Sequence, residues 1–324
     1  MKKLIDQDAY LLIGLIAVLI QIVSHALFEV NAESSLRIKT IILTIIEKEP
    51  ITTLNTINEY KARLLWLGSS LLSIAAYVIA LVWSIATVYR CCQSQYLYKI
   101  MGLGVTIGSL NLWSILTADY HSAMFNNVFS TTFEALKVSP LIGELLLGKV
   151  FVIIAIINVL AAITPVVILM AICSVITLPS ASDERNLTFF VERIKRLEQG
   201  IIIGSMIMLF GIIHMTAWTQ WPIAILDETV LKKSILATFV ATCQYWGVAF
   251  SLLLFSLYAC TLIYWRSQVR LVLRHAHPDI DASQWLQENG FNLSWQKHIS
   301  QIAAMLTPML AGLSSNGMNL LSLH

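Results

Sequence analysis

Two histidines lie within long apolar stretches of this sequence. His214 stands in GIIHMTAWTQWP, and His25 stands near the end of an earlier stretch. Imidazole nitrogens can ligate haem iron or hydrogen-bond a quinone carbonyl. Because an ionisable side chain inside a membrane helix is a candidate functional residue, the two histidines raise the alternative of a haem- or quinone-binding redox protein.

Uncharged amide side chains stand at a similar depth in other apolar stretches. Counted at about 1.5 Å per helical residue, they fall in the central-to-outer third of a bilayer. We predict one polar layer, which either hydrogen-bonds neighbouring helices together or lines a cavity for a small ligand. His214 is expected to join the helices that carry Asn111 and Gln244. The whole predicted layer is Gln21, His25, Asn111, Asn158, His214 and Gln244.

Glycines predict where two of these helices approach their neighbours. Gly104 and Gly108 have the four-residue spacing of a small-residue packing motif, as do Gly200 and Gly204, and Gly211 continues the second face towards the histidine. Lipid tails give apolar helices no hydrophobic reason to associate, so close contact at small residues matters. We therefore expect these five glycines to mark packing faces.

Motifs for catalysis or metal binding are weak. The sequence contains no HExxH, GxSxG or GxxxxGK[ST] pattern. His275, His277 and Asp279 are typical of a loop, because residues two apart on a helix do not face the same way. The five cysteines have neither a disulfide-framework spacing nor a zinc spacing. We expect no metal and no bound cofactor, and we favour a non-enzymatic protein.

Six apolar stretches position these residues. The chain has 324 residues, of which 57% are hydrophobic and 12% charged, whereas a soluble domain has about 25% charged residues. About 20 apolar residues span the hydrocarbon core as a helix, and lipid forces such stretches to be helical. The fold class is therefore all-α integral membrane, a six-transmembrane-helix bundle within residues 1–268. The predicted spans are 9–29, 64–89, 100–118, 150–178, 200–225 and 235–265.

Basic residues predict the orientation, because lysine and arginine concentrate in cytoplasmic segments. They fall on one side if both termini are cytoplasmic, and we expect a bacterial inner or plasma membrane. Residues 30–32 resemble a signal-peptidase site, but Asp6 and Asp8 favour a retained first helix. The residues that set the orientation are Lys2, Lys3, Arg90, Lys99, Arg185, Arg193, Lys195, Arg196, Arg266, Arg270 and Arg274.

Two segments on the expected cytoplasmic side carry apolar stripes at helical spacing. Residues 269–324 are predicted to form a helical tail, with one helix capped by Asp281 and another from about Trp295 that lies on the inner leaflet or docks on the bundle. The apolar section of that last helix is 12 residues long and contains Pro308 and Gly312, which disfavours a seventh span. The other stripe is Leu187, Phe190, Val191, Ile194 and Leu197.

These stripes and the absence of catalytic motifs predict a non-enzymatic membrane subunit or scaffold that docks a protein partner at its cytoplasmic face. The alternatives are the redox protein and an uncoupled pore, and an oligomer is left open. The lipid bilayer surrounds the helices in each case. The formal net charge of +2 argues against nucleic acid as a partner, because phosphate binding needs a concentrated basic face.

Overall fold

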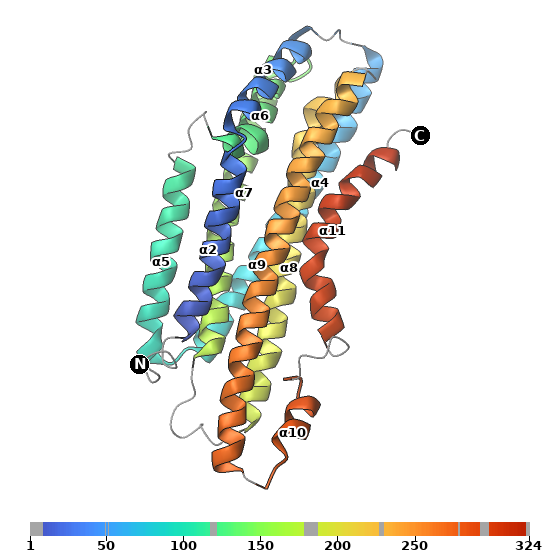
Figure 1. Cartoon of the computed structure of the whole chain (residues 1–324). Coiled ribbons are helices and arrows are strands. Elements are labelled where there is room, and N and C mark those ends of the chain that lie inside the picture. The colour runs from blue at the N-terminus through green and yellow to red at the C-terminus, as the bar shows by residue number, and fades with distance from the viewer. Residues whose placement is uncertain are drawn as a thin grey trace.

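The computed structural model describes residues 9–48, 50, 52–116, 122–177, 187–226, 230–277, 279–291 and 298–321, and every regular element in these ranges is a helix. Long helices lie side by side, with short helices at both ends (Figure 1). The elements are α2 (Ala9–Glu29), α3 (Ala32–Lys48), α4 (Thr53–Cys91), α5 (Ser94–Leu116), the π-helical segment η1 (Phe125–Ser130), α6 (Thr131–Val138), α7 (Glu144–Ile176), α8 (Leu187–Ala224), α9 (Val230–Ala276), α10 (Ala282–Glu288) and α11 (Ile299–Leu321).

Five of the described helices are long and apolar enough to cross a membrane: α2, α4, α7, α8 and α9. The chain is thus an all-α, multi-pass membrane protein, as predicted. The sixth predicted span falls on α5, which is helical but is not among the five. Some predicted features lie outside the described residues, namely Lys2, Lys3, Arg185, the helix start near Trp295 and the last residues of the spans 100–118 and 150–178.

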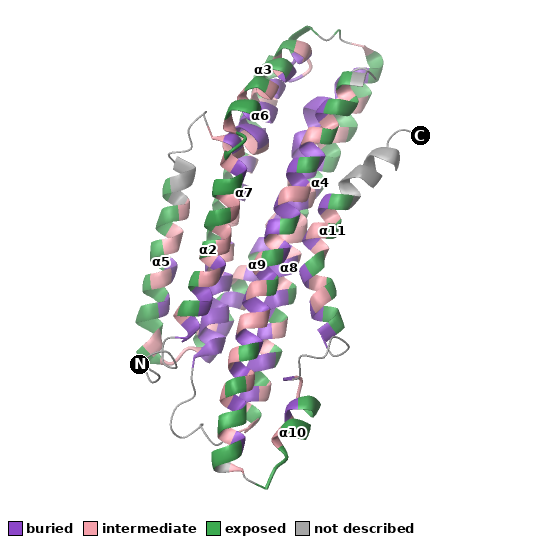
Figure 2. Cartoon of the chain, viewed as in Figure 1, coloured by how far each residue is buried: buried purple, intermediate pink, exposed green. Residues whose placement is uncertain are grey.

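The long helices alternate in direction, so that successive connections lie at opposite ends of the bundle (Figure 1). We call the end where α3, η1 and α6 gather the cap end, and the end where α2 begins the base end. Beyond the base end, α8 and α9 continue past the start of α2 and meet α10. Buried residues face inward between the helices and exposed ones face outward (Figure 2), which is the pattern expected when lipid surrounds a packed bundle.

Small residues bring the helices close at several of the predicted glycines. A Cβ atom added at Gly200 would lie 2.9 Å from the Trp83 ring, and one at Gly204 would lie 3.1 Å from Leu254. Gly104 of α5 lies directly against Met170 of α7. In contrast, nothing lies within 4 Å of a Cβ atom added at Gly108, and at Gly211 the nearest atom is the Tyr77 hydroxyl at 3.7 Å.

Helix α11, in the second half of the predicted tail 269–324, packs along α8 and α9. Its Met309 N–H donates to the Ser251 Oγ of α9 at 3.2 Å. The backbones also touch, since a Cβ atom at Gly312 would lie 2.9 Å from the Cys243 carbonyl oxygen. Of the two predicted placements for this helix, docking on the bundle is thus the one observed. It runs from the base end towards the cap end (Figure 1).

Candidate functional site

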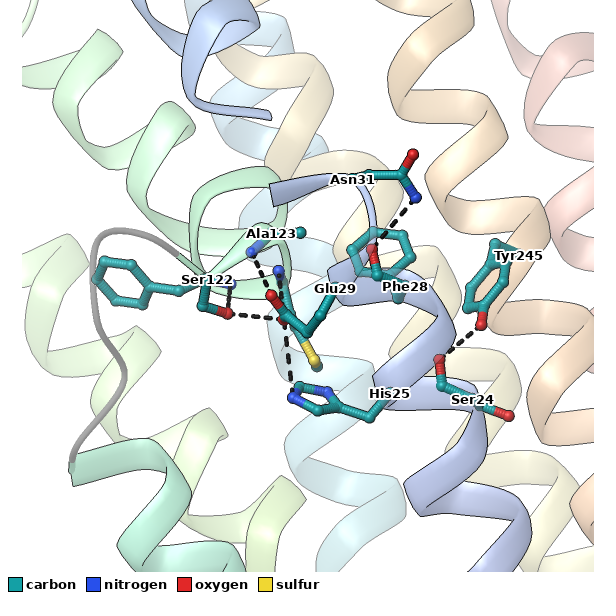
Figure 3. Close-up of polar contacts among 10 residues, drawn as sticks. Ser24, His25, Phe28, Glu29, Asn31, Ser122, Ala123 and Tyr245 are labelled. Carbon is teal, nitrogen blue, oxygen red and sulfur yellow. Dashed lines mark hydrogen bonds and ion pairs between the residues drawn. The ribbon is translucent and has the colours of Figure 1, made fainter. Parts of the chain in front are cut away.

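Glu29, the last residue of α2, holds the start of the helical segment in the cap. Its Oε1 accepts hydrogen bonds from the Ser122 Oγ at 2.8 Å and the Met124 N–H at 3.1 Å, and its Oε2 accepts one from the Ala123 N–H at 2.7 Å (Figure 3). The first N–H groups of a helix have no partner within the helix and carry a partial positive charge, so a carboxylate stabilises them. Glu29 thus joins α2 to the cap.

His25 belongs to this same junction. Its Nε2 lies 3.7 Å from the Glu29 Oε1, one turn further along α2 (Figure 3). On the other side of α2, the Tyr245 hydroxyl donates to the Ser24 carbonyl at 2.6 Å, and the Phe28 and Tyr245 rings are 5.1 Å apart. The end of α2 is therefore fixed to both the cap and α9, and His25 faces a carboxylate.

The cap itself is built on buried polar contacts between α3 and η1. Lys39 donates to the Ser130 Oγ at 2.5 Å, and the Asn127 Nδ2 donates to the Ser35 Oγ at 2.8 Å. π-helical turns are rare and occur often at functional sites. Here polar side chains of the π-helical segment hydrogen-bond to α3. The two elements of the cap are therefore joined to each other.

Replacing Glu29 with glutamine is expected to loosen the cap. The neutral amide loses the charge-assisted part of three hydrogen bonds and the interaction with the helix dipole, so we expect a loss of about 1–2 kcal/mol in the free energy of unfolding. Thermal unfolding of the detergent-purified protein measures it. The control is Glu33→Gln, at an exposed carboxylate paired with Arg37, which should cost less than about 1 kcal/mol. Equal effects of the two substitutions would contradict this role for Glu29.

His214 lies between α8 and α4, beside two serines. Its Nδ1 is 3.4 Å from the Oγ atoms of both Ser69 and Ser70. Each serine hydroxyl already donates its proton to the Trp66 carbonyl at 2.8 Å. The arrangement therefore favours a proton on the His214 Nδ1, donated to a serine oxygen. His214 joins α8 to α4, and not to the helices that carry Asn111 and Gln244.

A cluster of tryptophans surrounds this contact towards the cap end. The ring centres of Trp66 and Trp221 are 5.0 Å apart, and those of Trp66 and Trp218 are 5.7 Å apart. The Trp221 Nε1 donates at 3.1 Å to Glu59, a carboxylate that is only 3% exposed. Arg63 binds the other oxygen of Glu59 at 2.9 Å. Glu59 thus ties α4 to α8 where the apolar stretches end.

The predicted polar layer does not form a single site. Among the described residues, none of its six members hydrogen-bonds another. Asn111 donates weakly to the Ala162 carbonyl of α7 at 3.5 Å, in the turn before Pro165, which lies inside that helix. Asn158 is exposed, Gln21 is half-buried, and Gln244 lies against Gly312 of α11. Depth alone does not specify neighbours: α5, which carries Asn111, packs on α7, whereas α8 packs on α4 and α9.

Arg193 is a buried side chain that the sequence analysis used only as a charge that sets the orientation. It is 7% exposed, and its two terminal nitrogens donate to the Ser174 carbonyl at 3.0 Å and the Cys91 carbonyl at 2.7 Å. These carbonyls lie at the ends of α7 and α4, where the helix dipole favours a cation. Burial raises the pKa of the neighbouring Cys92 thiol, which favours its neutral form. The position of Arg193 between Phe190 and Ile194 on the apolar stripe was the available signal.

A buried tyrosine–histidine pair was also missed. The Tyr258 hydroxyl and the His298 Nδ1 are 2.7 Å apart, and both residues are 4% exposed. Glu198 of α8 interacts electrostatically with His298. Forty residues separate Tyr258 from His298 along the chain, so no local pattern could show the pair. It fastens the beginning of α11 to α9.

No protein-family model, curated protein or solved structure matches this chain. Within the ranges that the structure describes, no three His, Cys, Asp or Glu side chains are grouped so that they could hold a metal ion. The buried and half-buried ionisable groups described above have a common role. Glu29, Glu59 and Arg193 each bind groups on other elements, and so do His214 and His298. In the described structure, these five side chains link one helix or segment to another.

Proposed function

We propose that the chain is a non-enzymatic membrane subunit that docks a protein partner through the helices beyond its base end. The observation that carries the proposal is the excess length of two helices. At about 1.5 Å per residue, the 38 residues of α8 extend about 57 Å and the 47 residues of α9 about 70 Å, against about 30 Å of hydrocarbon. The surplus projects from the base end with α10. We call residues 187–198, 265–276 and 282–288 the base extension.

The base extension is a packed unit with its own apolar contacts. Phe190 and Trp265 are in edge contact at 5.4 Å, and Leu197, Leu273 and Leu286 belong to the same buried cluster. The apolar stripe on α8 that suggested a docking face is therefore covered by α9. A partner needs a different surface, and the outer face of α9 provides one.

That outer face combines arginines with an exposed leucine. Arg266, Arg270 and Arg274 follow one another at intervals of four residues, which places them along one side of a helix. Arg270 and Arg274 are exposed, and Leu271 between them is 45% exposed. None of the three guanidinium groups forms an ion pair with a described carboxylate. Such a surface fits a partner that is acidic and partly apolar, since arginine is enriched in protein interfaces.

A redox protein and an uncoupled pore have less support. A haem or quinone held jointly by His25 and His214 needs both imidazoles directed at one space. Instead, His25 faces Glu29 and His214 faces Ser69 and Ser70. The same contacts occupy the groups that a polar pore would expose. For the location, we propose a bacterial inner membrane with the base extension in the cytoplasm. Arg90, Lys99, Arg193, Lys195, Arg196, Arg266, Arg270 and Arg274 lie at that end, whereas glutamates accompany the basic residues of α3 and the start of α4.

Charge reversal tests the proposed docking surface. The variant combines Arg270→Glu with Arg274→Glu, and the complex is purified from the native host in mild detergent. We expect its mass to fall by the mass of one partner. Helical content and thermal stability should stay within experimental error, because both side chains are exposed. The control is Arg37→Glu on α3, at an exposed arginine of the cap. A wild-type mass in the double variant would refute the proposal.

A further inference from the structure

We infer that α11 crosses the membrane, so that the end of the described chain lies on the opposite side from the base extension. The inference is independent of the proposed function. It concerns a helix whose apolar part, Ile299–Leu313, is too short to qualify as a span by hydropathy. Contacts along its length fix its depth.

The first contact lies near the base end. His298, at the start of α11, meets Tyr258 at 2.7 Å. In Figure 1 the start of α11 lies at the same end of the bundle as the start of α2. The beginning of α11 therefore lies level with the part of α2 nearest the base end.

The later contacts move steadily towards the cap end. Met309 meets Ser251, a Cβ atom at Gly247 would lie 2.5 Å from the Pro308 carbonyl oxygen, and Gly312 meets Cys243. On α9 the contacts thus pass from residue 258 to residue 243, a rise of about 22 Å. The two helices are antiparallel.

One of these later contacts lies beside the cap. Ala311 packs on the cluster that contains Phe28 and Ala123, and Phe28 adjoins the Glu29 that holds the cap. From there α11 continues as a helix to Leu321. Its 23 residues extend about 34 Å, enough for a hydrocarbon core of about 30 Å.

The outward face of α11 fits lipid better than water. Exposed apolar side chains recur at helical spacing along it, namely Ile299, Leu306, Leu310 and Leu313, with exposures between 40% and 70%. A helix lying on the membrane surface presents a polar face outward. Here one face packs on α8 and α9 while the opposite face is apolar, as expected for a helix embedded in the bilayer.

Pro308 and Gly312 of α11, together with Gly247 of α9, fit this close packing. Pro308 has no N–H, and the Met309 N–H that follows is satisfied by the Ser251 hydroxyl of α9. Gly247 and Gly312 remove the side chains that would keep the two backbones apart. The features that disfavour a span in an isolated helix are thus compensated by the neighbouring helix.

Tags in the full-length chain test the inference. Three tagged versions carry a protease-cleavable epitope, one in the loop at Pro50 on the cap side, one between α9 and α10 at Asp279, and one after His324. Protease is added to intact spheroplasts of a bacterial host. We expect cleavage of the tags at residue 50 and after residue 324, and protection of the tag at residue 279.

The outcomes are distinguishable whichever way the protein is inserted. If the orientation is reversed, the tag at residue 279 is cleaved and the other two are protected, which still supports a crossing by α11. If the tags at residues 279 and 324 behave alike, α11 does not cross and the inference is wrong. Cleavage of all three tags after detergent lysis shows that each tag is cleavable.

Discussion

Replacing Gly247 with leucine is expected to detach α11 from the bundle. Even a Cβ atom at this position would lie 2.5 Å from the Pro308 carbonyl oxygen and 3.2 Å from the Met309 Cα. Both atoms belong to the backbone, so no side-chain rotation relieves the clash. Overpacking a helix interface typically costs about 1–3 kcal/mol, and here the whole helix must move. We therefore expect a loss of about 3 kcal/mol or more in the free energy of unfolding.

Thermal unfolding in detergent measures the effect, and Gly68→Leu is the matched control. Gly68 is also a helical glycine, on α4, but nothing lies within 4 Å of a Cβ atom added there. Leucine should be neutral there or stabilise the helix by up to about 1 kcal/mol, because it has the higher helix propensity. A Gly247→Leu protein as stable as wild type would show that α9 and α11 are not in backbone contact.

Replacing Arg193 with methionine is expected to destabilise the base end of the bundle by about 2–4 kcal/mol. The substitution removes two charge-assisted hydrogen bonds and leaves the Ser174 and Cys91 carbonyls without this donor. Lysine should restore only part of the stability, because one ammonium group does not reproduce the planar fork that reaches both carbonyls. Thermal unfolding again provides the measurement.

The control for Arg193 is its neighbour two residues along. Lys195 is exposed, and Lys195→Met should change stability by no more than about 0.5 kcal/mol. If Arg193→Met also left the stability unchanged, the guanidinium would not link α4, α7 and α8. Its low exposure would then need another explanation.

The strongest predictions from sequence are those that follow from lipid alone. Continuous apolar runs must be helical in a bilayer, and α2, α4, α7, α8 and α9 are recognisable for that reason. Hydropathy works less well for helices whose environment is protein. It does not detect α11, because its apolar part is short. Helices α8 and α9 cover one face of this helix, and Ser251 of α9 accepts a hydrogen bond from its backbone beside Pro308.

Which helices are neighbours is harder to predict from sequence than which face of a helix packs against protein. The glycine face of α8 is recognisable in the sequence, and Gly200 and Gly204 do contact neighbours. However, helical periodicity does not say which helix is opposite, and the polar atoms nearest the His214 ring belong to serines of α4. Tyr258 and His298 have no sequence signal at all, because only the return of α11 brings them together.

Site-specific photo-cross-linking at position 271 tests the docking claim most directly. Leu271 is replaced by a photoreactive amino acid in the full-length chain, expressed in the native host, and the same replacement at Ser34 on the exposed side of α3 is the control. We predict one adduct of defined mass at position 271, lost when Arg270 and Arg274 are also changed to glutamate, and no such adduct at position 34. The same adduct with and without the glutamates, or none at position 271, would contradict partner docking through the base extension.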